Sequence, residues 1–74
     1  MPDEVRWKQV FSSNVARLGW RENPPALLVE WVKGRVSEYD GVDEKLFEEL
    51  TKAPSVGSAL NERVKGRFKH QYIG

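Results

Sequence analysis

The segment ALLVEWVKGRVSEY, residues 26–39, carries the clearest structural pattern in this chain of 74 residues. Alternation along its first half places Leu27, Val29 and Trp31 on one face of an extended strand. Gly34 lies in the following KGR and can adopt the positive φ that tight turns between antiparallel strands require. VSEY then returns as the partner strand. The segment therefore predicts a β-hairpin with one apolar face that other elements must cover.

The residues before this hairpin also predict extended structure. The segment VRWKQVFSSNVARLGW, residues 5–20, alternates for much of its length, with Leu18 and Trp20 on one side of its second half. The turn-prone SSN at 12–14 interrupts the pattern, because its side chains compete for backbone hydrogen bonds. RENPP, residues 21–25, predicts a loop, since its two prolines cannot donate to a strand ladder.

A helix is predicted after the hairpin. Asp43 is a typical N-cap residue, and Leu46, Phe47 and Leu50 follow it at the spacing of one helical face. Pro54 ends this helix.

A second helix and a last strand complete the expected fold. Ser55 can cap a helix over VGSALNERVK, residues 56–65, whose apolar residues recur every four positions, and Gly66 stops it. RFKHQYI, residues 67–73, alternates again. Strands followed by helices predict an α+β domain with a small three- to four-stranded antiparallel sheet and two short helices packed on one face.

Length and composition limit the chain to one domain, residues 1–74, of which 1–4 are expected to be loose. Apolar residues make up 39% of the chain and charged ones 31%, as in a folded domain without a membrane segment. The absence of cysteine excludes disulfides and thiolate metal sites. We expect a cytoplasmic domain that is monomeric or weakly self-associating.

Catalytic, cofactor and metal sites find little support in the sequence. His70 is the only histidine, and no carboxylate stands at a spacing that would orient it as a base. The acidic residues of 43–49 favour a solvated helix face over a metal site. The glycines at 57 and 66 lack the spacing of a phosphate-binding loop. We therefore expect no enzyme activity, no cofactor and no bound metal.

The segments FSSNVARLGW, LLVEWVKGRVSEYDGV and LFEELTKAPSVGSALNERVKGRF resemble the KTSC domain over roughly residues 10–68. This short module occurs alone in bacterial and phage proteins and at the C-terminus of some lysyl-tRNA synthetases. A departure lies in the centre, where the Tyr-x-Tyr usual in the family reads Ser37-Glu38-Tyr39. The resemblance implies no settled activity, but the synthetase context associates the family with RNA binding.

Cations are concentrated near the C-terminus. Residues 61–74 contain Arg63, Lys65, Arg67 and Lys69 against one acid, although the whole chain has a net charge of only +1. Such a cluster can neutralise phosphates of a nucleic acid. The alternative is that Phe68 and Tyr72 belong to the core and the cations form a solvated face.

Other residues could extend this cluster. Lys33 and Arg35 flank the hairpin glycine, where they could contact phosphate or discourage edge-to-edge pairing of sheets. Trp20, which ends its strand beside a loop, is the tryptophan best placed for surface contact, whereas Trp31 is expected in the core. Tyr39 lies at the family motif and either anchors a buried hydrogen bond or faces a ligand.

Two functions follow from these residues. The first is nucleic-acid binding, with RNA preferred, through the four C-terminal cations, Lys33 and Arg35, with Trp20 or Tyr39 as stacking surface. The second is a protein-interaction module, such as a small phage or bacterial regulator that docks on a host protein through apolar or edge-strand surface.

Overall fold

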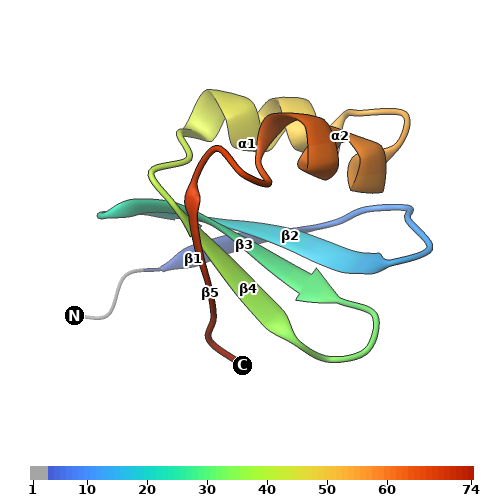
Figure 1. Cartoon of the computed structure of the whole chain (residues 1–74), viewed down its shortest axis with the longest axis horizontal. Coiled ribbons are helices and arrows are strands. Elements are labelled where there is room, and N and C mark those ends of the chain that lie inside the picture. Colours follow the sequence, from blue (N-terminus) through green and yellow to red (C-terminus); the bar gives the residue numbers. More distant parts are fainter. Residues whose placement is uncertain (1–3) are drawn as a thin grey trace.

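The computed structural model describes residues 4–74 as a sheet with two helices above it (Figure 1). The expectation for residues 1–3 therefore lies outside the described part. In chain order the elements are β1 (Val5–Gln9), β2 (Val15–Glu22), β3 (Pro25–Trp31), β4 (Val36–Asp40), α1 (Glu44–Thr51), α2 (Val56–Arg63) and β5 (Lys69–Tyr72).

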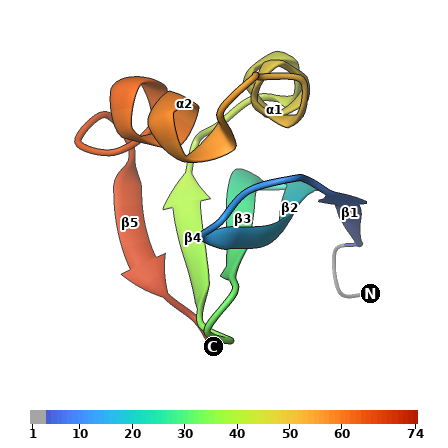
Figure 2. The same cartoon turned by 90° about the vertical axis from the view of Figure 1, so that its right-hand side faces the viewer.

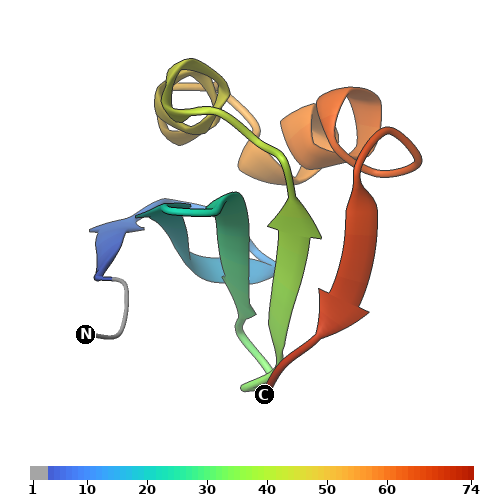
Figure 3. The ribbon, with the colours of Figure 1, turned by 90° about the vertical axis from the view of Figure 1, so that its left-hand side faces the viewer.

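The sheet is an antiparallel meander in which every strand pairs with its neighbour in the sequence, in the order β1-β2-β3-β4-β5. The two helices follow β4 and precede β5 in the chain. They cover one face of the strongly twisted sheet (Figures 2 and 3). The α+β class and the helices on one face are confirmed. The prediction of three to four strands is wrong, because β1 pairs with β2 and the short β5 pairs with β4.

The turns explain most of the boundaries. Gly34 has a φ of +99° in the turn between β3 and β4, as the hairpin prediction requires. The loop predicted over 21–25 is shorter than expected, because Glu22 and Pro25 already pair across the strands. Only Asn23 and Pro24 form this turn. Pro25 is the first residue of β3, a position at which a strand tolerates proline.

Both predicted helix caps are present. The Asp43 carboxylate accepts a hydrogen bond from the Leu46 backbone N–H at 2.9 Å, and the Ser55 hydroxyl accepts one from the Ser58 N–H. These bonds satisfy backbone donors that have no partner inside the helix. α2 ends at Arg63, earlier than predicted, and a turn that contains Gly66 at a φ of +80° leads into β5.

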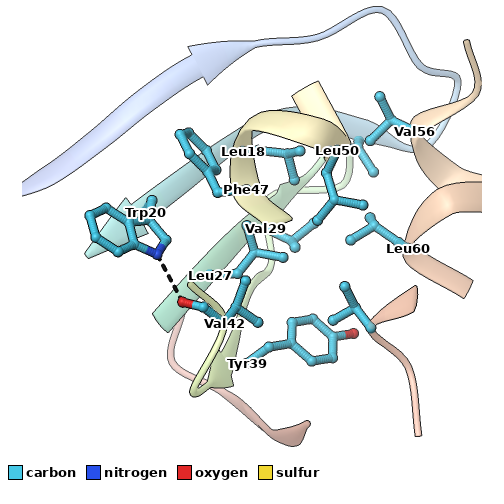
Figure 4. Packing of buried hydrophobic residues seen from close by; sticks show 12 residues of the cluster. Leu18, Trp20, Leu27, Val29, Tyr39, Val42, Phe47, Leu50, Val56 and Leu60 are labelled. Atoms are coloured by element: carbon cyan, nitrogen blue, oxygen red, sulfur yellow. Dashed lines mark hydrogen bonds between the residues drawn. The ribbon is translucent and has the colours of Figure 1, made fainter. Parts of the chain in front are cut away.

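The core lies between the helices and the covered face of the sheet (Figure 4). Leu18, Leu27 and Val29 project from β2 and β3 against Phe47 and other apolar side chains of the helices. The alternation in residues 26–39 therefore predicted the buried face correctly. This core positions the ends of β3, β4 and β5 relative to α2.

The opposite face has no helix over it, yet part of it is closed by side chains. Trp7 of β1 lies over Gly19 of β2, and the Arg17 guanidinium stacks on the Trp7 ring with its Cζ 4.0 Å from the ring centroid. On the same face, Glu38 of β4 accepts hydrogen bonds from Arg21 of β2 and Gln71 of β5. These polar contacts tie the edge strand β5 to the middle of the sheet.

Candidate functional site

Trp31, the last residue of β3, lies at the centre of a cleft at one end of the molecule. Its indole N–H donates to the Ser37 hydroxyl at 2.8 Å, which fixes the ring orientation. The ring is only half-buried and forms part of the wall of three adjoining hollows of about 380, 470 and 210 Å³. Lys65 also lines all three hollows. We call these three hollows together the Trp31 cleft.

The hollow of about 380 Å³ collects cations from two separate segments. Lys33 and Arg35 come from the β3–β4 turn, and Lys65 comes from the turn after α2. The Lys65 ammonium lies 5.5 Å from the centroid of the Trp31 ring, and the Arg35 Cζ lies 4.6 Å from that of Tyr72. These are cation–π distances, so the aromatic faces hold the cations near the cleft.

A row of aromatic rings borders the cleft on the side of β4 and β5. Tyr39 and His70 are register partners with ring centroids 4.8 Å apart, and His70 meets Tyr72 at 4.8 Å in an edge-to-face arrangement. Tyr72 is 57% exposed, so its ring is accessible to a ligand. All three rings line the hollow of about 210 Å³ together with Trp31.

The charge of the Trp31 cleft is one-sided. Of the residues between 4 and 74, those that line its three hollows include no aspartate or glutamate. Four arginines elsewhere, Arg6, Arg17, Arg21 and Arg63, each form an ion pair with a glutamate. Among residues 4–74, Lys33, Arg35 and Lys65 make no ion pair with a carboxylate. The cleft is therefore a local region of positive potential on a nearly neutral chain, and it suits an anionic ligand.

The C-terminal cations predicted from the sequence do not form one surface. Lys65 enters the cleft, but Arg63 pairs with Glu49 of α1, and the Arg67 side chain donates to the Glu62 carbonyl at 3.1 Å. Lys69 pairs in register with Asp40 and alternates with His70, so it projects from the helix-free face. The convergence of tail and hairpin turn involves Lys65, Lys33 and Arg35 only.

The two aromatic residues predicted as stacking surfaces are buried. Trp20 is 6% exposed, and its indole N–H donates to the Val42 carbonyl at 2.8 Å (Figure 4). Tyr39 is 3% exposed and belongs to the core cluster, and burial raises the pKa of its phenol. A base cannot stack on the Trp20 ring without opening the core. Any stacking surface must therefore come from other, exposed aromatic residues.

Sequence reasoning placed Trp31 in the core and did not single out Phe11. Phe11 is fully exposed in the β1–β2 loop and lines the hollow of about 470 Å³ on the α2 side of Trp31. The alternation of β3 correctly gave the face of Trp31, but not that its ring is only half-buried there. The sequence signalled this part of the cleft only by an aromatic residue, Phe11, directly before the turn-prone SSN at 12–14.

The described residues restrict the other kinds of site. Between residues 4 and 74 there is no group of three or more histidine or acidic residues arranged to hold a metal ion. No helix in this range has the length and apolar character needed to cross a membrane.

Comparisons with known proteins identify relatives of this fold. The KTSC domain family matches residues 11–68, which include every residue of the cleft except His70 and Tyr72. A lysine–tRNA ligase of Nostoc punctiforme is 31% identical over 61 residues, which are 82% of this chain and 11% of the ligase. The chain thus spans only about a tenth of that relative.

A solved structure shows the same architecture. The crystal structure of a KTSC domain protein from Yersinia pestis matches with a TM-score of 0.86 and 25% sequence identity, over 96% of this chain and all of the other. The family match, the ligase relative and this structure agree with the resemblance noted from the sequence. The chain belongs to the KTSC domain family.

Proposed function

We propose that this chain is a non-enzymatic RNA-binding domain whose binding site is the Trp31 cleft. The observation that carries the proposal is the convergence of Lys33, Arg35 and Lys65 around exposed aromatic surface, with no carboxylate among the described residues of the lining. Cations neutralise phosphates, and aromatic rings accept the faces of bases; together these are the contacts of nucleic-acid-binding proteins. The similarity to part of a lysine–tRNA ligase supports RNA as the nucleic acid.

The charge pattern permits a matched test. The variant K33A/R35A/K65A removes the cleft cations, whereas R63A/R67A/K69A removes three cations that lie elsewhere. Both variants change the net charge by the same amount, so a difference between them reports position and not overall charge. Each cation that neutralises a phosphate contributes roughly −0.7 to the slope of log affinity against log salt for a single strand.

The expected result is a clear separation of the two variants. With three contacts the wild-type slope is about −2, which corresponds to a loss of affinity of roughly 20-fold between 50 and 200 mM salt. K33A/R35A/K65A should lose most of this slope, and R63A/R67A/K69A should keep it. Fluorescence anisotropy with a labelled RNA oligonucleotide, and with the matching DNA, measures the affinity and the salt slope of each variant. Equal behaviour of the two variants would refute the proposed site.

A protein partner remains the competing function, because Phe11, Val32 and Tyr72 expose apolar surface at the same end of the molecule. The edge strand β5 also lacks a second neighbour in the sheet. This function predicts no RNA binding at low salt in the assay above.

A further inference from the structure

The shape of the Trp31 cleft limits which form of RNA it can hold, and the following inference rests on the proposed function. Trp31 and Lys65 line all three hollows, and a different exposed aromatic ring borders each of the two larger ones. Phe11 borders the hollow of about 470 Å³ on the α2 side, and Tyr72 borders the hollow of about 380 Å³ on the hairpin side. These two larger hollows fall within the roughly 300–1,000 Å³ of small-molecule pockets, which is room for a single nucleotide in each.

The two exposed rings require unpaired bases. Phe11 is fully exposed; Tyr72 is more than half exposed and offers the part of its ring that Arg35, over the ring, and His70, in edge-to-face contact, leave open. In an RNA duplex the base faces are covered by neighbouring base pairs, and proteins contact phosphates and 2′-hydroxyls instead. A single strand can turn its bases outward onto aromatic side chains.

The distribution of cations also favours a short single strand. Lys33, Arg35 and Lys65 surround one hollow, whereas a duplex presents phosphates along two strands and is bound by widely spread contacts. Outside the cleft, the arginines of β1, β2 and α2 are paired with glutamates, and lysines with no ion pair among residues 4–74, such as Lys8 and Lys69, line none of the three hollows. The unpaired positive charge of the cleft therefore matches a few phosphates close together.

The geometry points to an unpaired two-nucleotide step of single-stranded RNA as the ligand of the Trp31 cleft. One base stacks on Phe11 and the next on Tyr72. The phosphate between them lies near Lys65, and the flanking phosphate lies near Arg35 and Lys33. Phe11 is thereby assigned as a binding residue contributed by the β1–β2 loop.

The test compares RNA forms and one aromatic substitution. Oligouridylates of one, two, four and eight nucleotides, and a blunt duplex of eight base pairs, are titrated into the wild type and into Phe11→Ala. Ile73→Ala is the control, because Ile73 is an exposed apolar residue outside the three hollows. Since Phe11 is fully exposed, Phe11→Ala should melt at the wild-type temperature.

We expect affinity to rise steeply from one to two nucleotides, and the eight-nucleotide strand to bind at least ten times more tightly than the duplex. Stacking of one base is worth roughly 5- to 150-fold in affinity, so Phe11→Ala should weaken single-strand binding by this factor and Ile73→Ala should not. Duplex binding as tight as the single strand, or no effect of Phe11→Ala, would overturn this inference while leaving RNA binding intact. Failure of every RNA to bind would overturn the proposed function as well.

Discussion

The contact between Trp7 and Gly19 gives a sharp prediction about the strand β1, which lies outside the residues that match the family. A Cβ added at Gly19 would lie 2.7 Å from Val5 Cγ1 and 2.8 Å from Trp7 Cε3. Carbon atoms in contact ordinarily lie about 3.5–4.0 Å apart. Gly19→Ala therefore forces β1 and the Trp7 ring to move outward by about 1 Å.

The cost of this movement follows from known overpacking effects. Inserting a methyl group into a well-packed site costs roughly 1–3 kcal/mol. In a domain of this size each 1 kcal/mol lowers the melting temperature by roughly 4–8 °C, so Gly19→Ala should lower it by about 4–24 °C. Gly57→Ala is the matched control, because a Cβ there has no heavy atom within 4 Å and alanine favours the helix.

Thermal unfolding followed by circular dichroism measures both variants. The amides of β1 and their partners in β2 should also exchange with solvent faster in Gly19→Ala, whereas those of β3 and β4 should change little. A melting temperature within 2 °C of the wild type would show that Trp7 does not lie on Gly19 as described. Equal loss of protection in all strands would show that β1 is not the element displaced.

Three further predictions concern local interactions. Glu38 is 5% exposed, and its hydrogen bonds from Gln71 and Arg21 hold the pKa of its carboxyl below the ordinary value of 4.5. A carboxylate with a lowered pKa stabilises the fold above its ordinary pKa, and this contribution is lost as the pH falls through the folded-state pKa. Glu38→Gln should therefore destabilise the fold by about 1.5–3 kcal/mol at pH 7 and by much less at pH 3, as measured by thermal melts. An equal difference at both pH values would contradict this linkage. Trp20→Phe leaves the Val42 carbonyl without its donor and should lower the free energy of unfolding in urea by about 1–3 kcal/mol. An unchanged free energy of unfolding would show that this hydrogen bond is absent. Asp43→Ala removes the N-cap of α1 and should cost about 0.5–2 kcal/mol in the same assay, whereas a neutral effect would argue against the cap.

The sequence predicted the local elements of this fold well, because each had a local cause. The alternation of Leu27 and Val29 identified the buried face of β3, and Asp43 and Ser55 identified the starts of both helices. A last strand was predicted from the alternation of residues 67–73, but its pairing with β4 is a long-range contact that alternation does not reveal, and the sheet was expected to have three to four strands and not five. No local pattern in so short a segment could reveal its partner.

The candidate site was predicted only in part. Cations that lie close in sequence were expected to lie together, but Arg63 points to Glu49 of α1, whereas Lys65 joins Lys33 and Arg35 from another turn. Which cations meet depends on how the helices cross the sheet, and this is set by packing of the core. Trp20 and Trp31 show the same dependence on packing. Both lie on the face of the sheet that the helices cover, but Trp20 is buried and Trp31 is only half-buried.

An NMR titration with a single-stranded RNA octamer at 50 and 200 mM salt tests most directly whether the Trp31 cleft binds RNA. Such binding predicts the largest chemical-shift changes at the Trp31 indole N–H and at the amides of residues 33–35, 65 and 72, and these changes should shrink at the higher salt. Shifts that are absent at 50 mM salt, or that fall on α1 and the helix-free face of the sheet, would contradict it.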